Sequence, residues 1–398
     1  MNNRFKLLFC LLIFPCLSLW AWDFGLLLNQ NAGYGGLGSD GDLDYSIGVV
    51  PRISGLIGST GDFIVSAGLE ADYNNGWGFV PELLRTELSF HPGNWAFEIG
   101  RMYNSDPLGF VAEGLFDGVK VAYNSEVGTF SVGAWYTGLL YKKRANIGMT
   151  AEETEADIAP LDYGDFAGTY FAPRRFLGAL AWEHLGGAVQ ARVGIFGQFD
   201  FFSDKPLNSQ YAALKLTLPV NAFTFDLGGC LELIENGGGF DTALAAETRI
   251  AFTPPLRFKN RLSLLARYAS GNGESGQLAA FLPFTTRSQG DILKVKLSGL
   301  SILSLDYVIR LHPAFSAGLT STCFIRNDLG TYTGYPLPEE NSKGYFLGNE
   351  FFARFLWSPA SDLQVNLGGG LFLPSLGDAA PKAENFWRVE INVIFSLL

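Results

Sequence analysis

Charged residues are scarce in this chain of 398 residues: Asp, Glu, Lys and Arg make up 17% of it, against about 25% in typical soluble domains. After residue 23, no segment has the run of about 18 uncharged residues that a transmembrane helix needs. The formal net charge is −11, which argues against the basic surface that binds nucleic acid. The sequence therefore predicts neither a helical membrane protein nor a nucleic-acid-binding protein.

Cysteine is equally rare. Of the four cysteines, Cys10 and Cys16 fall in the N-terminal leader, and only Cys230 and Cys323 remain beyond it. They form no Cys-x-x-Cys pair, so the sequence predicts no disulfide framework and no redox or zinc motif of that kind.

Motifs of enzymes and metal sites occur only in the wrong context. Glycines in 33–38 and 271–276 match the dinucleotide fingerprint, but neither segment lies between a strand and a helix. Residues 40–44 begin like a calcium loop, yet the twelfth position is Pro51 rather than Glu. None of the three histidines has an identifiable Ser or Cys nucleophile beside it; these are His91, His184 and His312. We expect no enzyme, no cofactor and no metal.

The first 21 residues have the layout of a secretory signal peptide. Arg4 and Lys6 precede an uncharged apolar run, and cleavage is predicted after Ala21. The alternative, a lipoprotein acylated at Cys16, has a poor lipidation box. The mature chain, residues 22–398, is then expected to be one exported domain.

Glycine and aromatic residues are abundant: Gly accounts for 48 residues, and Phe, Trp and Tyr for 14% of the chain. Apolar and polar residues alternate with a period of two, for example where Glu247 and Arg249 alternate with Ala246, Thr248 and Ile250. This period is typical of β-strands with one apolar face. Eighteen strands are predicted: 23–34, 44–57, 63–73, 80–91, 95–103, 116–124, 127–141, 174–185, 187–202, 208–219, 222–234, 240–253, 259–270, 296–311, 315–327, 344–357, 362–373 and 385–397.

The connections between these strands alternate in character. Even-to-odd links are short and rich in Pro or Gly, whereas several odd-to-even links are long, the longest being 142–173 and 271–295. Short turns on one side and long loops on the other are typical of transmembrane β-barrels. The sequence therefore predicts a closed antiparallel barrel of about 18 strands in the bacterial outer membrane.

A soluble all-β protein of the periplasm is the alternative. Its apolar faces would point inward, and periodicity does not distinguish the two directions. Strand length and loop parity favour the barrel. So do aromatic residues at the expected strand ends, namely Tyr73, Trp77, Trp95, Tyr103 and Trp357.

The alternating last strand, 385–398, resembles the terminal assembly signal of bacterial outer-membrane proteins. About 50 residues near the C-terminus show a resemblance to the closing hairpin of alginate-export-type and related porins, which rests on 348–350, 357–359, 362–363 and 372–374. It implies an eighteen-stranded porin whose last strand is recognised by the barrel assembly machinery. Here Phe395 is followed by three more residues, whereas such chains usually end on Phe.

Charged strand residues are expected on the inner face of the barrel, because a charge facing lipid costs about 2–4 kcal/mol at the bilayer midplane. They are candidates to line a wet pore or to brace the wall as ion pairs, and both roles remain open. The predicted pore-lining residues are Arg85, Arg192, Arg249, Arg267, Arg310, Arg354, Arg388, Glu87, Glu247, Asp306, Glu350 and Glu390.

The expected function is passive diffusion of small hydrophilic solutes, with organic anions favoured modestly by the arginines. A surface-exposed adhesin or structural barrel with a plugged lumen is the alternative, and a transporter of hydrophobic substrates is a third. The acidic loop 142–173 is expected to be solvated, to rim or plug the mouth, or to bind divalent cations weakly. The expected partners are outer-membrane lipid and small solutes.

Overall fold

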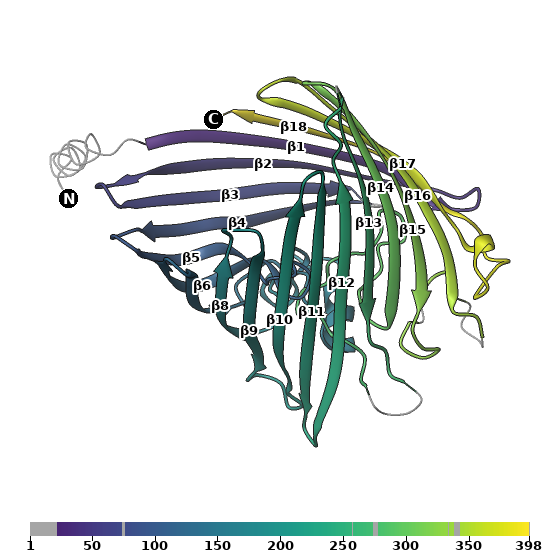
Figure 1. The fold of residues 1–398 in the computed structure, drawn as a ribbon, viewed down its shortest axis with the longest axis horizontal. Coiled ribbons are helices and arrows are strands. Elements are labelled where there is room, and N and C mark those ends of the chain that lie inside the picture. The colour runs from purple at the N-terminus through teal and green to yellow at the C-terminus, as the bar shows by residue number, and fades with distance from the viewer. Residues whose placement is uncertain are drawn as a thin grey trace.

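A computed structural model describes residues 22–73, 76–256, 258–273, 278–332, 334–337 and 343–397. They form one antiparallel sheet of 18 strands, in which β1 pairs with both β2 and β18, so the sheet closes into a barrel (Figure 1). The predicted signal peptide, 1–21, lies outside the described residues.

The strands follow chain order around the barrel, with three short α-helices in one loop and a 3₁₀ turn in another. The elements are β1 (Trp22–Leu37), β2 (Asp42–Ile57), β3 (Gly61–Tyr73), β4 (Trp77–Phe90), β5 (Trp95–Ser105), β6 (Glu113–Ser125), β7 (Gly128–Tyr136), α2 (Lys142–Ala145), α3 (Ala151–Ile158), α4 (Phe166–Tyr170), β8 (Arg175–His184), β9 (Gln190–Asp200), β10 (Leu207–Val220), β11 (Phe223–Asn236), β12 (Phe240–Phe252), β13 (Lys259–Ala269), β14 (Leu300–His312), β15 (Phe315–Arg326), β16 (Phe346–Ala360), β17 (Leu363–Leu373), η1 (Pro374–Leu376) and β18 (Phe386–Leu397).

Each of the 18 predicted strands corresponds to one observed strand, so the predicted fold class is confirmed. Two boundaries differ by more than three residues. The predicted strand 127–141 stops at Tyr136, and the predicted strand 296–311 starts only at Leu300. In both cases the apolar residues beyond the boundary belong to loops that pack inside the barrel, and their hydrophobicity imitated a longer strand.

Loop parity is also confirmed. Each even-numbered strand is joined to the next by a short turn, and the long connections, 137–174, 270–299 and 327–345, all follow odd-numbered strands. The residues of the tight turns match their backbone conformations: Gly58, Gly93 and Asn221 have φ of 64°, 63° and 54°, the left-handed region that Gly and Asn tolerate best.

Large apolar side chains point out of the barrel. On β14, Leu303, Leu305 and Tyr307 are exposed, whereas Ile302, the residue before Leu303, is buried. Polar and charged side chains such as Glu247 and Glu350 are buried on the opposite face. This is the inverse of a soluble β-protein, so the soluble alternative is wrong: the outer face suits lipid, and the inner face suits water and ion pairs.

Aromatic side chains gather at both ends of the strands. Trp77 packs on Tyr45 and Tyr73 at the end that carries the long loops, and Trp95 packs on Tyr123 at the end with short turns. Such belts mark the two interfaces of a membrane.

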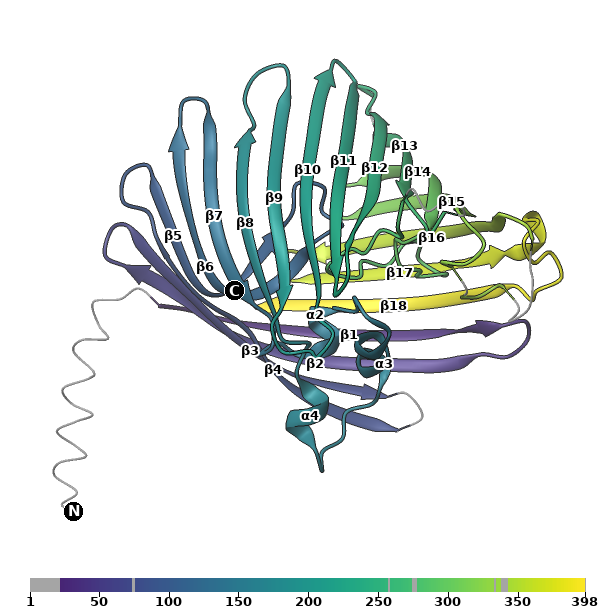
Figure 2. The same cartoon turned by 90° about the horizontal axis from the view of Figure 1, so that it is seen from below.

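The long loops fold into the barrel and build an apolar core there. Buried residues of the loops, such as Phe110, Phe281 and Leu297, pack against inner-face residues such as Phe324 and Phe372. None of the described helices is long and apolar enough to cross a membrane. Helices α2, α3 and α4 lie close together in Figure 2, and α2 and α4 contact β4 through Arg144 and Tyr170.

Neighbouring residues on β17 test the orientation of the two faces. Leu367 is exposed on the outer face, and Asn366 lies on the inner face beside a cavity of about 410 Å³. Leu367→Arg should lower the free energy of unfolding by about 2–4 kcal/mol, because it places a charge in lipid. The control, Asn366→Arg, should cost less than half of that.

The measurement is urea unfolding in phospholipid vesicles, followed by circular dichroism and by heat-modifiable gel mobility. Equal destabilisation by the two substitutions would contradict the assignment of faces.

Candidate functional site

All twelve charged residues predicted to line the pore lie on the inner face of the barrel wall. Most of them alternate along the strand with exposed apolar residues, as Arg249 does with Ile250 and as Glu390 does with Val389 and Ile391. The twelve do not form a free ladder of charges, because most are paired with one another or with loops.

Glu247 on β12 is the centre of the largest ion-pair network. Its buried carboxylate, 3% exposed, accepts hydrogen bonds from Arg267 of β13, at 3.0 Å from Nε. It also lies 3.7 Å from Lys215 Nζ on β10 and 3.6 Å from Arg249 on its own strand. Asp226 of β11 is 3.5 Å from Arg249 Nε. The Glu247 carboxylate thus pairs with basic side chains from three strands and braces this part of the wall.

The other arginines on the wall are paired more simply. Arg388 lies 2.8 Å from Asp44 and 3.1 Å from Glu390, Arg85 pairs with Glu87, and Arg192 is 4.0 Å from Glu183. Arg310 instead donates to the backbone carbonyl of Pro313, at 2.6 Å, in the turn after β14. Asp306 accepts from Thr320 at 3.0 Å and lies 3.9 Å from Arg261.

Glu350 holds the long loop 270–299 against the wall. Its two carboxylate oxygens accept hydrogen bonds from the backbone amides of Asp291, Ile292 and Leu293, at 2.6, 3.0 and 2.9 Å. Arg354 lies four residues further along β16 on the same face and pairs with the side chain of Asp291. No feature of the sequence predicted this contact, because Asp291 lies 59 residues away from Glu350 along the chain.

A second anchor holds the other side of the same loop. Leu282 donates its amide to Glu232, at 2.8 Å, and accepts from the Tyr211 hydroxyl, at 2.7 Å. Both wall residues are buried. Arg267 adds a third anchor through the side chain of Gln289. Glu232 was not among the predicted site residues, although it alternates on β11 with the exposed Leu231 and Leu233.

The short loop 106–112 also turns inward. Asp106 accepts from the amides of Leu108, Gly109, Val111 and Ala112, at 2.8, 3.1, 2.8 and 2.9 Å, which ties the loop into a compact turn. Burial raises the pKa of the Asp106 carboxyl above its usual value, although the four amides oppose this shift.

The tip of loop 106–112 reaches the wall network. The ring of Phe110 lies 4.7 Å from the guanidinium of Arg267. An aromatic ring therefore covers part of the guanidinium of Arg267, one of the predicted arginines.

The acidic loop 137–174 is more ordered than a solvated loop. Helix α3 begins with a capping box of Thr150 and Glu153, and Glu153 also pairs with the buried Arg175 at 2.8 Å. Lys296, from loop 270–299, donates to the carbonyl of Gly148, and burial lowers the pKa of this lysine. The two long loops are thus joined inside the barrel, and loop 137–174 narrows it.

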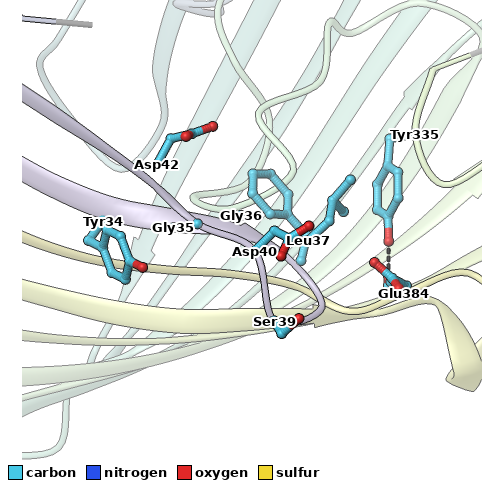
Figure 3. A pocket seen from close by; sticks show the side chains of 11 residues that line it. Tyr34, Gly35, Gly36, Leu37, Ser39, Asp40, Asp42, Tyr335 and Glu384 are labelled. Atoms are coloured by element: carbon cyan, nitrogen blue, oxygen red, sulfur yellow. Dashed lines mark hydrogen bonds between the residues drawn. The ribbon is translucent and has the colours of Figure 1, made fainter. Parts of the chain in front are cut away.

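Several cavities open along the lumen. At the outer mouth, a cavity of about 950 Å³ is lined by Asp40, Asp42, Tyr335 and Glu384, where the Tyr335 hydroxyl donates to the carbonyl of Glu384 (Figure 3). A cavity of about 410 Å³ shares Tyr335 with it and reaches Lys296.

Two further cavities lie elsewhere, the first among the outer loops and the second on the inner face. One, of about 1190 Å³, is beside α3 and the loop before β10, with Arg174 and Lys205 in its lining. The other, of about 410 Å³, lies between Asp306, Arg354 and Glu390. Charged side chains of both signs therefore face these spaces.

Within the described ranges, no cluster of three or more His, Cys, Asp or Glu residues could hold a metal ion. His91 lies 3.6 Å from Asp62, His184 stacks on Trp182, and His312 accepts from the amide of Ala314.

Comparisons with known proteins support the fold of this chain. No family model and no curated protein matches the chain. The solved structure of Pseudomonas aeruginosa OccK2 (OpdF) in complex with glucuronate is 12% identical, with a TM-score of 0.64, and the match covers 94% of this chain and 98% of that one. A BenF-like porin from Pseudomonas fluorescens Pf-5 is 9% identical, with a TM-score of 0.63 and coverage of 94% and 99%.

A third structure, Pseudomonas aeruginosa OccK5 (OpdH), is 10% identical, with a TM-score of 0.60 and coverage of 94% and 98%. At these identities the likeness shows the fold alone. It supports the predicted porin class as an architecture and gives no support to the alginate-export type.

Removal of the Glu350 anchor should release loop 270–299. In Glu350→Ala, three backbone amides lose a charged acceptor, and such hydrogen bonds are each worth about 1.5–3 kcal/mol. Trypsin cleavage after Arg287 or Lys294 should then be at least about ten-fold faster than in the parent protein.

Glu390→Ala is the matched control, because Glu390 pairs with Arg388 on its own strand and makes no hydrogen bond to the loop. If the two variants are cleaved at the same rate, Glu350 does not anchor the loop.

Proposed function

We propose that this protein is an outer-membrane channel for the diffusion of small hydrophilic solutes. The observation that carries this proposal is the closed eighteen-stranded barrel with an apolar outer face and a charged inner face. Barrels of this size enclose an aqueous interior. The similarity of fold to a BenF-like porin and to OccK2 supports the same function.

An adhesin or structural barrel needs loops that project to meet a partner. Here the two longest loops fold inward and are tied to the wall at Glu350, Glu232 and Arg175. The cavities that open at the outer mouth face the solvent between the loops. These observations favour a narrow channel over an adhesin.

The cellular setting follows from the same proposal. The outer face would lie against outer-membrane lipid, and β18, which pairs with both β1 and β17, would be the strand engaged by the barrel assembly machinery. The signal-peptide-like leader is consistent with export. The alginate-export resemblance contributes no substrate to the proposal.

A modest preference for organic anions is our proposal for selectivity. The side chains of Arg249 and Arg354 are paired but still 37% and 50% exposed, so a solute carboxylate can approach them. Arginine keeps its charge at any accessible pH, and its planar group suits carboxylates. Carboxylates of similar number on the same face limit the preference to about 1 kcal/mol in a wet pore.

Charge neutralisation tests the role of the arginines. The triple variant Arg249→Gln, Arg267→Gln and Arg354→Gln should lower the anion-to-cation permeability ratio, measured in planar bilayers, by about five-fold or less. The matched control replaces the same three residues by Lys, which keeps the charge and should keep the ratio.

An unchanged ratio together with lost heat resistance would show that these arginines only brace the wall. A purified, folded protein without stepwise currents would overturn the channel itself.

The preferred solute class can be tested by liposome swelling. Glucuronate, the ligand in the OccK2 structure, should enter proteoliposomes faster than glucose, which has nearly the same size and no charge. The triple Gln variant should remove the difference. Faster entry of glucose would contradict the proposed anion preference and leave the channel function intact.

A further inference from the structure

One boundary in the barrel wall is hardly paired at all. Strands β4 and β5 share three residue pairs, Leu88 with Ile99, Ser89 with Glu98 and Phe90 with Phe97. Each of the other ladders joins at least eight pairs. From Trp77 to about Thr86, the side of β4 that faces β5 is therefore a free strand edge.

The sequence of β4 suits a free edge. Its partner on the other side is β3, which pairs with β4 along its whole length. Phe79, Pro81 and Leu83 are exposed and alternate, so their backbone groups point to the same side. Proline has no amide to donate, and within sheets it is confined to edges and bulges. Pro81 is the one sequence signal of this opening.

Side chains of other segments satisfy this edge. The Tyr163 hydroxyl accepts from the Phe79 amide, at 2.6 Å, and donates to the Phe79 carbonyl, at 3.1 Å. The Tyr170 hydroxyl donates to the Pro81 carbonyl, at 2.7 Å. Tyr163 and Tyr170 belong to loop 137–174. Three hydrogen bonds from this loop thus replace the backbone hydrogen bonds that β5 would otherwise make to this part of β4.

On the other side, β5 turns away at Gly100. This residue has φ of 113°, and a Cβ there would lie 1.8 Å from the Thr86 carbonyl oxygen. The next residue, Arg101, donates its amide to the Thr86 hydroxyl and its guanidinium to the Leu83 carbonyl. Asp117 of β6 holds the same guanidinium at 2.8 Å. The opening therefore has a fixed frame on both sides.

The free edge lies at the depth of the membrane. Trp77 and Tyr73, at the outer ends of β4 and β3, belong to the aromatic belt, and Phe79 and Leu83 follow toward the membrane interior with exposed side chains. Unpaired backbone groups are very costly in lipid, so the wall needs the loop as a cover.

The inner side of the cover is an aromatic cluster. Tyr141 and Tyr170 pack over Val80, with Leu161 and Phe166 around them. Around this cluster, Arg144 of α2 reaches Glu82 and Glu70 on the inner face of β4 and β3, at 3.1 and 3.3 Å. In Figure 2, α4 lies beside β4. Loop 137–174 thus touches the strand edge and the inner face at the same place.

We propose that the outer part of the β4–β5 boundary is a lateral opening between the lumen and the lipid, covered by loop 137–174. Hydroxyl contacts from a loop separate without breaking a backbone ladder, and the aromatic cluster behind them offers an apolar path. The opening fits amphipathic solutes with an apolar chain, which would pass sideways between lumen and membrane. This goes beyond the channel proposed above, which runs along the barrel axis.

Thiol labelling from the lipid phase tests the opening. In a background with Cys230→Ala and Cys323→Ser, the reporter Val80→Cys is placed behind the cover, where Val80 is 5% exposed. The reagent is pyrene maleimide dissolved in the vesicle bilayer, and a charged methanethiosulfonate is applied separately from water. The control reporter is Ala243→Cys, buried on the inner face of β12, where the ladder with β11 is continuous.

We expect pyrene maleimide to label Cys at position 80 at least about ten-fold faster than Cys at position 243. Tyr163→Phe with Tyr170→Phe removes the hydroxyl contacts and should raise the rate at position 80 by a further factor of about five or more, with no change at position 243. Should the double variant not assemble, the comparison of the two reporters in the parent background decides alone.

Equal labelling of the two reporters from lipid, or labelling of position 80 only from water, would overturn the lateral opening. Dodecanoate in the vesicles should slow labelling at position 80, and glucose should not; absence of protection would refute the amphipathic solute class. Bilayer conductance plays no part in these readouts, so their failure is distinguishable from failure of the channel.

Discussion

A backbone amide or carbonyl in lipid has no water to bond, so every strand in the membrane must find a partner on both sides. The pairing of β1 with β18 meets this requirement by joining the two ends of the chain. Alternation then places each residue on one of two faces, and closure decides which face meets lipid. The apolar outer surface, the charged interior and the inward loops all depend on that closed ladder.

Inside the barrel, charge is organised by pairing. Glu247 gathers Lys215, Arg249 and Arg267, and Glu350 binds the backbone of loop 270–299. Partly buried carboxylates without such partners would be strongly disfavoured, so the wall and the loops supply each other's counter-charges or amides. Arg249 and Arg354 remain accessible, and Arg354 borders a cavity on the inner face.

The β4–β5 boundary departs from the constraint that governs the rest of the wall. There the ladder is replaced by Tyr163, Tyr170 and Arg101, which bond the free carbonyls of β4 one by one. The same loop that narrows the lumen also covers this edge. Any movement of loop 137–174 therefore changes both the interior and the wall.

The sequence by itself determined the strands, the parity of the loops and the face on which each charged residue lies, because a period of two and the position of turn residues are local properties. It also placed the aromatic belts, through residues such as Trp77 and Trp95. Only the tertiary structure decided which charges pair, since Arg354 meets Asp291 and Arg175 meets Glu153 through loops distant in the chain. The inward folding of those loops and the unpaired edge at Pro81 depend on which strands meet, and strand alternation carries no information about contacts between loops and wall.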